Sequence, residues 1–271
     1  MPPQSVRSTR ATSEESYCLP FEIVQKQLRD LMDQHPPISD GRYACYLITG
    51  SGRYSGIPRT VECAVFQEFF DNSPAVMNEA YAPYEAHSHF FLVVDCGTRE
   101  PSGCLRVATH SEAGFKTLND IARPPLAIPA RTVMNRHGID KPETCWDVGT
   151  LAVLKKYRGH GHAVSTMLYG QFYAAARKAG VEHAVAILDE HAYSQLTETF
   201  AVPFIPIVDT QPFDYLGSER SRAAYLHLPA VVPAVEATMA ALDAGLRELL
   251  KPNLSRVIYA EGLPEVVLVS Q

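Results

Sequence analysis

The chain has 271 residues, 46% of them hydrophobic, and a formal net charge of −6 at pH 7. This composition supplies ample apolar surface for a core, and the length allows one elaborated domain or two small ones. The acidic balance and the lack of a long basic run argue against nucleic acid as the main ligand.

The N-terminal segment shows no apolar periodicity. Residues 1–19 mix Ser, Thr, Arg and Pro with acids and contain no apolar signal-peptide core, so we expect a mobile tail there and a single domain over residues 20–271 that includes a C-terminal helical extension. No apolar run reaches the ~20 residues that cross a bilayer. The six cysteines are scattered without C-x-x-C or zinc spacing. These features predict a cytoplasmic protein with reduced thiols and no membrane span.

Apolar periodicity and turn residues predict helices and strands along most of the chain. In chain order we expect helix 21–34, strand 42–49, helix 59–70, strands 89–95 and 103–109, strand 147–154, helix 163–179, strand 184–188, helix 191–200, a hairpin of 204–207 and 223–228, helix 231–250 and an extended segment 257–269. Residues 110–143 contain four prolines and are expected to be an irregular excursion. The order predicts an α/β fold with a mixed sheet.

A glycine-rich loop separates strand 147–154 from helix 163–179. Its sequence is Tyr157-Arg158-Gly159-His160-Gly161-His162-Ala163. A loop in this place directs backbone N–H groups and the positive end of a helix at one anion. The glycines leave room for a phosphate, and Arg158 adds charge at the rim. The spacing matches neither G-x-G-x-x-G nor a P-loop, so we predict a different phosphate-binding loop, the alternative being a helix start opened by glycines.

The run Leu151-Ala152-Val153 followed by Arg-x-x-Gly-x-Ala at 158–163 resembles the pyrophosphate loop of the GNAT (Gcn5-related N-acyltransferase) superfamily. The segment 146–153, W-D-V-G-T-L-A-V, resembles a strand of its acyl-homoserine-lactone synthase and N-acyl amino acid synthase branch, W-E-(I/L)-S-R-(L/F)-A-V. Tyr84-Glu85 followed by G-C-L-R-V at 103–107 resembles that branch's Y-D and G-x-x-R-L. The similarity covers patches between residues 59 and 228.

The resemblance implies a GNAT-like mixed, mostly antiparallel central sheet flanked by helices, with N- and C-terminal extensions. It also implies transfer of an acyl group from acetyl-CoA or acyl-CoA, or from the phosphopantetheine of an acyl-carrier protein, to a primary amine of a small molecule such as an amino acid or a natural-product intermediate. The glycine loop favours coenzyme A, and the upstream similarity favours a carrier protein. Asp147 replaces the branch's glutamate and Thr150 its arginine, so a non-catalytic acyl-CoA-binding or regulatory module is the alternative.

The resemblance assigns roles to individual residues. Acyl transfer to an amine needs a proton acceptor, a stabilised oxyanion and a thiolate that can leave. Asp147 is the leading candidate base and Glu85 the second. The backbone N–H of Val153 is the candidate oxyanion donor. Tyr193 is the nearest match to the family's acid, whose expected place holds Thr197.

Further residues are expected to bind the substrates. The guanidinium of Arg106 could hold an acceptor carboxylate bidentately, and Trp146 is expected in the core or the cleft wall. For Asp147, Glu85 and Arg106 a purely structural ion pair is the open alternative. The expected donor-binding set is Leu151, Val153, Arg158, Gly159, His160, Gly161, His162 and Ala163. The His87/His89 and His160/His162 pairs lack third and fourth ligands nearby, so no metal is expected.

Overall fold

The computed structural model describes residues 17–38, 40–159, 162–260 and 262–269. Within these residues, nine strands form one sheet in the order β6-β8-β5-β4-β3-β2-β1-β9, and β7 also pairs with β8. The strands are β1 (Tyr43–Thr49), β2 (Ser88–Asp95), β3 (Glu100–Thr109), β4 (Cys145–Val153), β5 (His183–Asp189), β6 (Ile205–Pro206), β7 (Phe213–Tyr215), β8 (Ser218–His227) and β9 (Val267–Leu268). Among the described strands, β4–β5 and β1–β9 pair in parallel and the rest are antiparallel. The predicted mixed, mostly antiparallel sheet is therefore confirmed.

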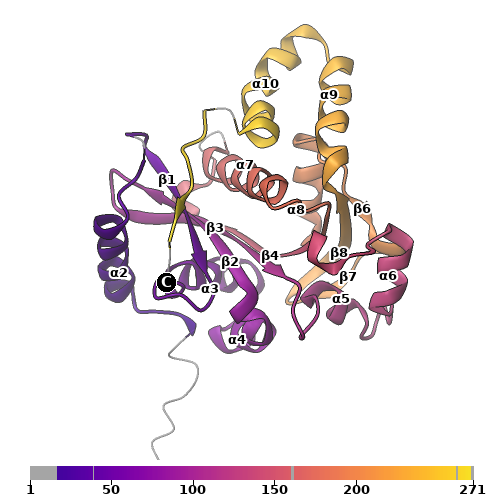
Figure 1. Cartoon of the computed structure of the whole chain (residues 1–271), viewed down its shortest axis with the longest axis horizontal. Coiled ribbons are helices and arrows are strands. Elements are labelled where there is room, and N and C mark those ends of the chain that lie inside the picture. Colours follow the sequence, from indigo (N-terminus) through magenta and orange to yellow (C-terminus); the bar gives the residue numbers. More distant parts are fainter. Residues whose placement is uncertain (1–16, 39, 160–161, 261, 270–271) are drawn as a thin grey trace, which may run out of the picture.

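Helices cover both faces of this sheet (Figure 1). They are α2 (Phe21–Gln34), α3 (Gly56–Phe70), α4 (Pro74–Tyr81), α5 (Lys116–Ile121), α6 (Ala130–His137), α7 (Ala163–Lys178), α8 (Glu190–Ser194), α9 (Val231–Ala241) and α10 (Ala244–Tyr259). As a result, the two faces of β2 pack in different hydrophobic clusters. Phe91 and Val93 pack on the α7 side, whereas Phe90 and Leu92 pack on the side of α2 and α3. A strand buried on both faces has a continuous apolar sequence, as β2 does.

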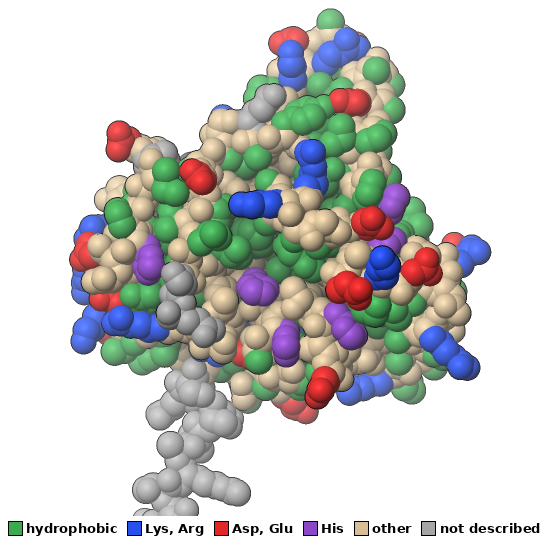
Figure 2. All heavy atoms as spheres, in the orientation of Figure 1, with side chains coloured by type: hydrophobic (Ala, Val, Ile, Leu, Met, Phe, Trp, Pro, Cys, Tyr) green, Lys and Arg blue, Asp and Glu red, His purple; other side chains and the backbone are tan. Residues whose placement is uncertain are grey.

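One face of the molecule combines an apolar middle with a more charged margin. On the face in Figure 2, apolar side chains gather across the middle, beside α7, and most charged side chains lie toward the edges. Across the described residues, no helix has both the length and the apolar character that crossing a bilayer requires.

Three predicted segments differ from the structure. Residues 110–143 are not irregular throughout, because they contain α5 and α6. The predicted helix 231–250 is two helices: Leu242 is extended, and the Asp243 carboxylate accepts a hydrogen bond from the Leu246 N–H at 2.9 Å, which caps a new helix. The predicted extended segment 257–269 begins inside α10, and β9 alone is a strand.

The segment before α2 is held against α3. Cys18 and Cys63 form a disulfide, which corrects the expectation that all thiols are reduced. Tyr17 is buried, and the Leu19 N–H donates to the Thr60 hydroxyl at 2.9 Å. Residues 17–19 are therefore anchored, and they are not part of a mobile tail.

Candidate active site

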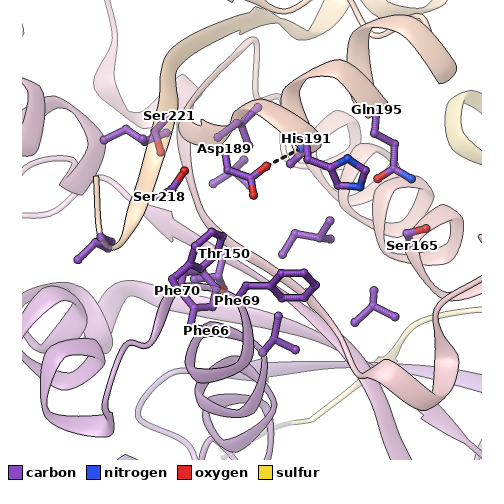
Figure 3. Close-up of a pocket in the computed structure, with 18 of the residues that line it drawn as sticks. Phe66, Phe69, Phe70, Thr150, Ser165, Asp189, His191, Gln195, Ser218 and Ser221 are labelled. Carbon is purple, nitrogen blue, oxygen red and sulfur yellow. Dashed lines mark hydrogen bonds between the residues drawn. The ribbon is translucent and has the colours of Figure 1, made fainter. Parts of the chain in front are cut away.

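β4 and β5 run side by side for only part of their length. Their pairing joins residues 145–148 to residues 183–186, although β4 continues to Val153 and β5 to Asp189. Beyond the last pair lies a cavity of about 410 Å³, lined by the ends of both strands and by parts of α3, α7, α8 and the β7–β8 turn (Figure 3). The separation of the two strands exposes backbone that a continuous sheet would cover.

A β-bulge in β4 begins this separation. The register between β3 and β4 shifts by one residue at Gly149, which has no residue opposite it. The Tyr81 hydroxyl donates to the Gly149 carbonyl at 2.9 Å. A Cβ at Gly149 would lie 3.0 Å from the Tyr81 ring, so a glycine suits this close approach. The bulge interrupts the alternation of side chains, and residues 148–150 line the cavity consecutively.

The hydrogen bonds of β4 also orient its backbone. The Leu154 N–H donates to the Ser102 carbonyl of the neighbouring chain segment at 3.0 Å. Because antiparallel ladders alternate between bonded and non-bonded pairs, the N–H groups of Val153 and Leu151 point away from β3. They are directed at the side from which β5 has separated, and both residues line the cavity.

The glycine loop closes one end of the cavity. Gly159 has φ of +80°, and, apart from its chain neighbours, no atom of the described residues lies within 4 Å of the place that a Cβ would take. His162 is also left-handed, with φ of 58°, and its carbonyl accepts the Thr166 N–H at 2.8 Å at the start of α7. Gly159 and His162 line the cavity, and Ala163 is the first residue of α7. His160 and Gly161 lie outside the described residues. The open space beside Gly159 and the N-terminus of α7 suits an anionic group.

Arg158 connects this loop to the elements on either side. Its Nε donates to the Val153 carbonyl at 2.7 Å and its Nη2 to Glu68 of α3 at 2.8 Å. The guanidinium lies over the Phe69 ring, 4.5 Å from the centroid. Arg158 thus lines the cavity, and its charge is partly neutralised by Glu68.

A second wall of the cavity consists of α3 and the β7–β8 turn. Phe66, Phe69 and Phe70 line the cavity from α3. The turn packs directly on the end of this helix, since a Cβ at Gly217 would lie 2.3 Å from the Phe70 carbonyl oxygen. The Asn72 amide donates to the Leu216 carbonyl at 2.8 Å. Segments more than 140 residues apart in sequence thus form one aromatic wall.

The structure does not bring Asp147 to the cavity. Its side chain is 1% exposed, and its two oxygens accept the Thr117 N–H at 2.6 Å and the Thr117 hydroxyl at 2.7 Å. Burial raises the pKa of this carboxyl to about 6, although the Thr117 bonds and the nearby Lys116 oppose the increase. Side chains alternate between the two faces of β4, and Asp147 lies on the face toward α5. Its position on the strand that leads into the glycine loop therefore does not place its carboxylate beside that loop.

Arg106 and Glu85 also lie outside the cavity lining. Arg106 is 1% exposed and forms a two-pronged bond with the fully buried Glu62, from Nε to Oε1 at 2.9 Å and from Nη2 to Oε2 at 2.7 Å. Its Nη1 donates to Glu85 at 2.7 Å and its Nη2 to the Tyr17 hydroxyl at 2.8 Å. Glu85 also pairs with Arg59 at 3.1 Å. These bonds occupy the Arg106 guanidinium, which was expected to hold the acceptor carboxylate, and the Glu85 carboxylate, which was expected to take a proton from the acceptor amine.

The two predicted aromatic site residues also lie elsewhere. The Tyr193 hydroxyl donates to the Phe204 carbonyl at 3.3 Å, and its ring lies 5.2 Å from the Arg222 guanidinium. Trp146 packs in the core against Phe172, with 6.0 Å between ring centroids. Neither side chain lines the cavity. Trp146 is thus a partly buried residue packed against the core.

Five of the polar residues that line the cavity were missed by the sequence analysis. They come from the end of β5, from α8 with the turn that follows it, and from β8. They are Asp189, His191, Gln195, Ser218 and Ser221. One signal was available, because Asp189 is a carboxylate that directly follows the apolar run of β5. Within the described ranges, no three His, Cys, Asp or Glu side chains are grouped so that they could hold a metal ion.

The backbone is similar to those of acyltransferases of known structure. FeeM, an N-acyl amino acid synthase from uncultured soil microbes, is 11% identical, with 74% of this chain and 99% of that chain covered and a TM-score of 0.52. The CoA-dependent acyl-homoserine lactone synthase BjaI is 12% identical, with 84% and 94% covered and a TM-score of 0.49. Tetrahymena Gcn5 is 13% identical, with 68% and 95% covered and a TM-score of 0.40. No family model matches the sequence, and no curated protein matches it significantly. The likeness to FeeM shows that the two chains share a fold, as the resemblance to N-acyl amino acid synthases predicted.

Proposed function

We propose that this chain is an N-acyltransferase that moves an acyl group from a pantetheine thioester to a primary amine of a small molecule. The observation that carries the proposal is the cavity between the separated ends of β4 and β5, which ends at the glycine loop before α7. A pantetheine chain can extend between the two strands while the phosphate groups attached to it in coenzyme A or phosphopantetheine lie beside Gly159 and the N-terminus of α7.

The backbone of β4 is suited to the chemical step. The amine nitrogen attacks the thioester carbonyl carbon, the C–N bond forms, the C–S bond breaks and the thiolate leaves. Negative charge develops on the carbonyl oxygen, where the N–H groups of Leu151 and Val153 would stabilise it. An ammonium substrate must lose one proton before it attacks, and its nitrogen loses a second as the amide forms. A cavity carboxylate or water can accept the first proton, and the thiolate can accept the second. Among the described carboxylates, Asp189 lines the cavity, whereas Asp147 and Glu85 do not.

A non-catalytic acyl-CoA-binding module is the second candidate function. Asp147, Glu85 and Tyr193 are each hydrogen-bonded to partners outside the cavity. A protein that binds coenzyme A yet releases no thiol from acetyl-, octanoyl- or benzoyl-CoA with any amine in a broad panel would be such a module. Thiol release together with an N-acylated product by mass spectrometry would identify the enzyme, and acyl-CoA compared with an acyl-carrier protein would identify the donor.

A pair of glycine variants tests the donor site. Gly159→Glu places a side chain and a negative charge in the open space beside the loop, and we expect coenzyme A affinity to fall at least about tenfold. Gly180→Glu is the matched control, because Gly180 also has a positive φ, of +70°, and nothing within 4 Å of its Cβ position, but lies after α7 and outside the cavity lining. Calorimetric titration of coenzyme A into both folded variants measures the two affinities. Equal affinities would mean that the loop serves only to start α7.

A further inference from the structure

The walls of the cavity have an acidic and an apolar part. Asp189 lies at the end of β5, and Figure 3 shows its carboxylate over the cavity, across from the phenylalanines of α3. One carboxylate oxygen accepts the Ala192 N–H at 2.6 Å. Asp189 is the one carboxylate among the described residues that line the cavity. A negative charge is therefore available beside the separated strands.

The cationic side chains near the cavity are already paired. Arg158, the one Arg or Lys among the described lining residues, belongs to the loop end and bonds to Glu68. Arg222 forms a bidentate salt bridge with Glu190, with N–O distances of 2.8 and 3.0 Å. Lys116, 5% exposed, bonds to Asp120 at 2.6 Å and to Tyr215. Among the described residues that line the cavity, Arg158 is thus the one guanidinium or ammonium group, and none lies beside Asp189 to hold a carboxylate of the acceptor.

The apolar part of the wall offers packing surface. Phe66, Phe69 and Phe70 present aromatic rings to the cavity, and Phe69 remains 58% exposed. Exposed aromatic side chains that line a cavity are suited to bind an apolar ligand. The side chain of Val65 and the β7–β8 turn extend this surface.

We infer that the acceptor is an apolar primary amine without a carboxylate, whose ammonium pairs with Asp189 and whose apolar part packs on the α3 phenylalanines. This inference rests on the proposed function and narrows its acceptor. A carboxylated amine, such as an amino acid, would place a second negative charge near Asp189 without a cation to compensate it.

Matched ligands and matched variants test this inference. Phenethylamine and phenylalanine, which differ by one carboxylate, are titrated into the full-length protein saturated with coenzyme A. We expect phenethylamine to bind at least about tenfold more tightly. In Asp189→Asn its affinity should fall by about ten- to a hundredfold, the value of a charge-assisted bond, with coenzyme A affinity unchanged. Asparagine caps a helix as well as aspartate does, so the fold is retained.

Asp243→Asn is the control, because Asp243 caps α10 by the same geometry and lies outside the cavity lining. It should leave both affinities unchanged. Equal or tighter binding of phenylalanine, or unchanged phenethylamine affinity in Asp189→Asn, would overturn the inference. Failure of the proposed function has a separate signature, which is selective amine binding without thiol release from any acyl-CoA.

Discussion

The buried pair of Arg106 and Glu62 should contribute to stability, and substitution of the arginine measures how much. The two side chains are 1% and 0% exposed, and two parallel bonds join them. Arg106→Met leaves the Glu62 carboxylate buried without its cation, which costs about 3–5 kcal/mol in comparable cases. Since domains are stable by about 5–15 kcal/mol, the variant should lose a large share of its free energy of unfolding.

Urea unfolding followed by far-UV circular dichroism and by the fluorescence of Trp146, the single tryptophan, measures this loss. Arg222→Met is the matched control, because Arg222 and Glu190 have the same two-pronged geometry but are 24% and 35% exposed. It should cost about 1 kcal/mol or less. The double variant Arg106→Met, Glu62→Met should be more stable than Arg106→Met alone, since it removes the uncompensated charge.

The opposite result would restore the role expected from the sequence. If Arg106→Met is no less stable than Arg222→Met, the buried network contributes little. If it also raises the KM of a carboxylated acceptor with donor affinity unchanged, Arg106 binds that carboxylate, and the interpretation of Arg106 as a structural residue is wrong.

Two further predictions concern Asp147 and the disulfide. Burial raises the pKa of Asp147 from 3.8 to about 6, so the folded state holds the proton more tightly than the unfolded state does. The resulting contribution to the free energy of unfolding is present below about pH 4 and is lost as the pH rises to about 6. Relative to Asp147→Asn, which can keep both Thr117 bonds, the wild type should lose about 3 kcal/mol over that window; parallel curves from pH 3.5 to 7 would show that Asp147 has an ordinary pKa. For the Cys18–Cys63 bridge, thiol titration of the denatured, unreduced protein should find four thiols and six after reduction. Cys63→Ser should cost at most about 4 kcal/mol, because the bridge closes a loop of 45 residues, and six thiols without reduction would exclude the bridge.

Local signals in the sequence determined the elements that depend on nearby residues. The spacing of Val24, Leu28 and Leu31, followed by prolines, predicted α2 with its observed bounds, because a helix needs only an apolar stripe and a stop signal. The strand, glycine loop and helix around Gly159 were predicted for the same reason. The mostly antiparallel sheet was also expected, through the resemblance that these motifs carried.

The composition of the cavity depended on contacts between distant segments. The bulge at Gly149 and the pairing with β3 and β5 decide which face of β4 carries Asp147 and which lines the cavity, and a one-residue change of register reverses a side chain. The aromatic wall forms only where the β7–β8 turn packs on α3. The sequence singled out Arg106 as a candidate site residue, but its partner Glu62 lies 44 residues earlier. Pairing across such distances depends on how the elements pack, so the tertiary structure decided which charged residues stabilise the fold and which face the cavity.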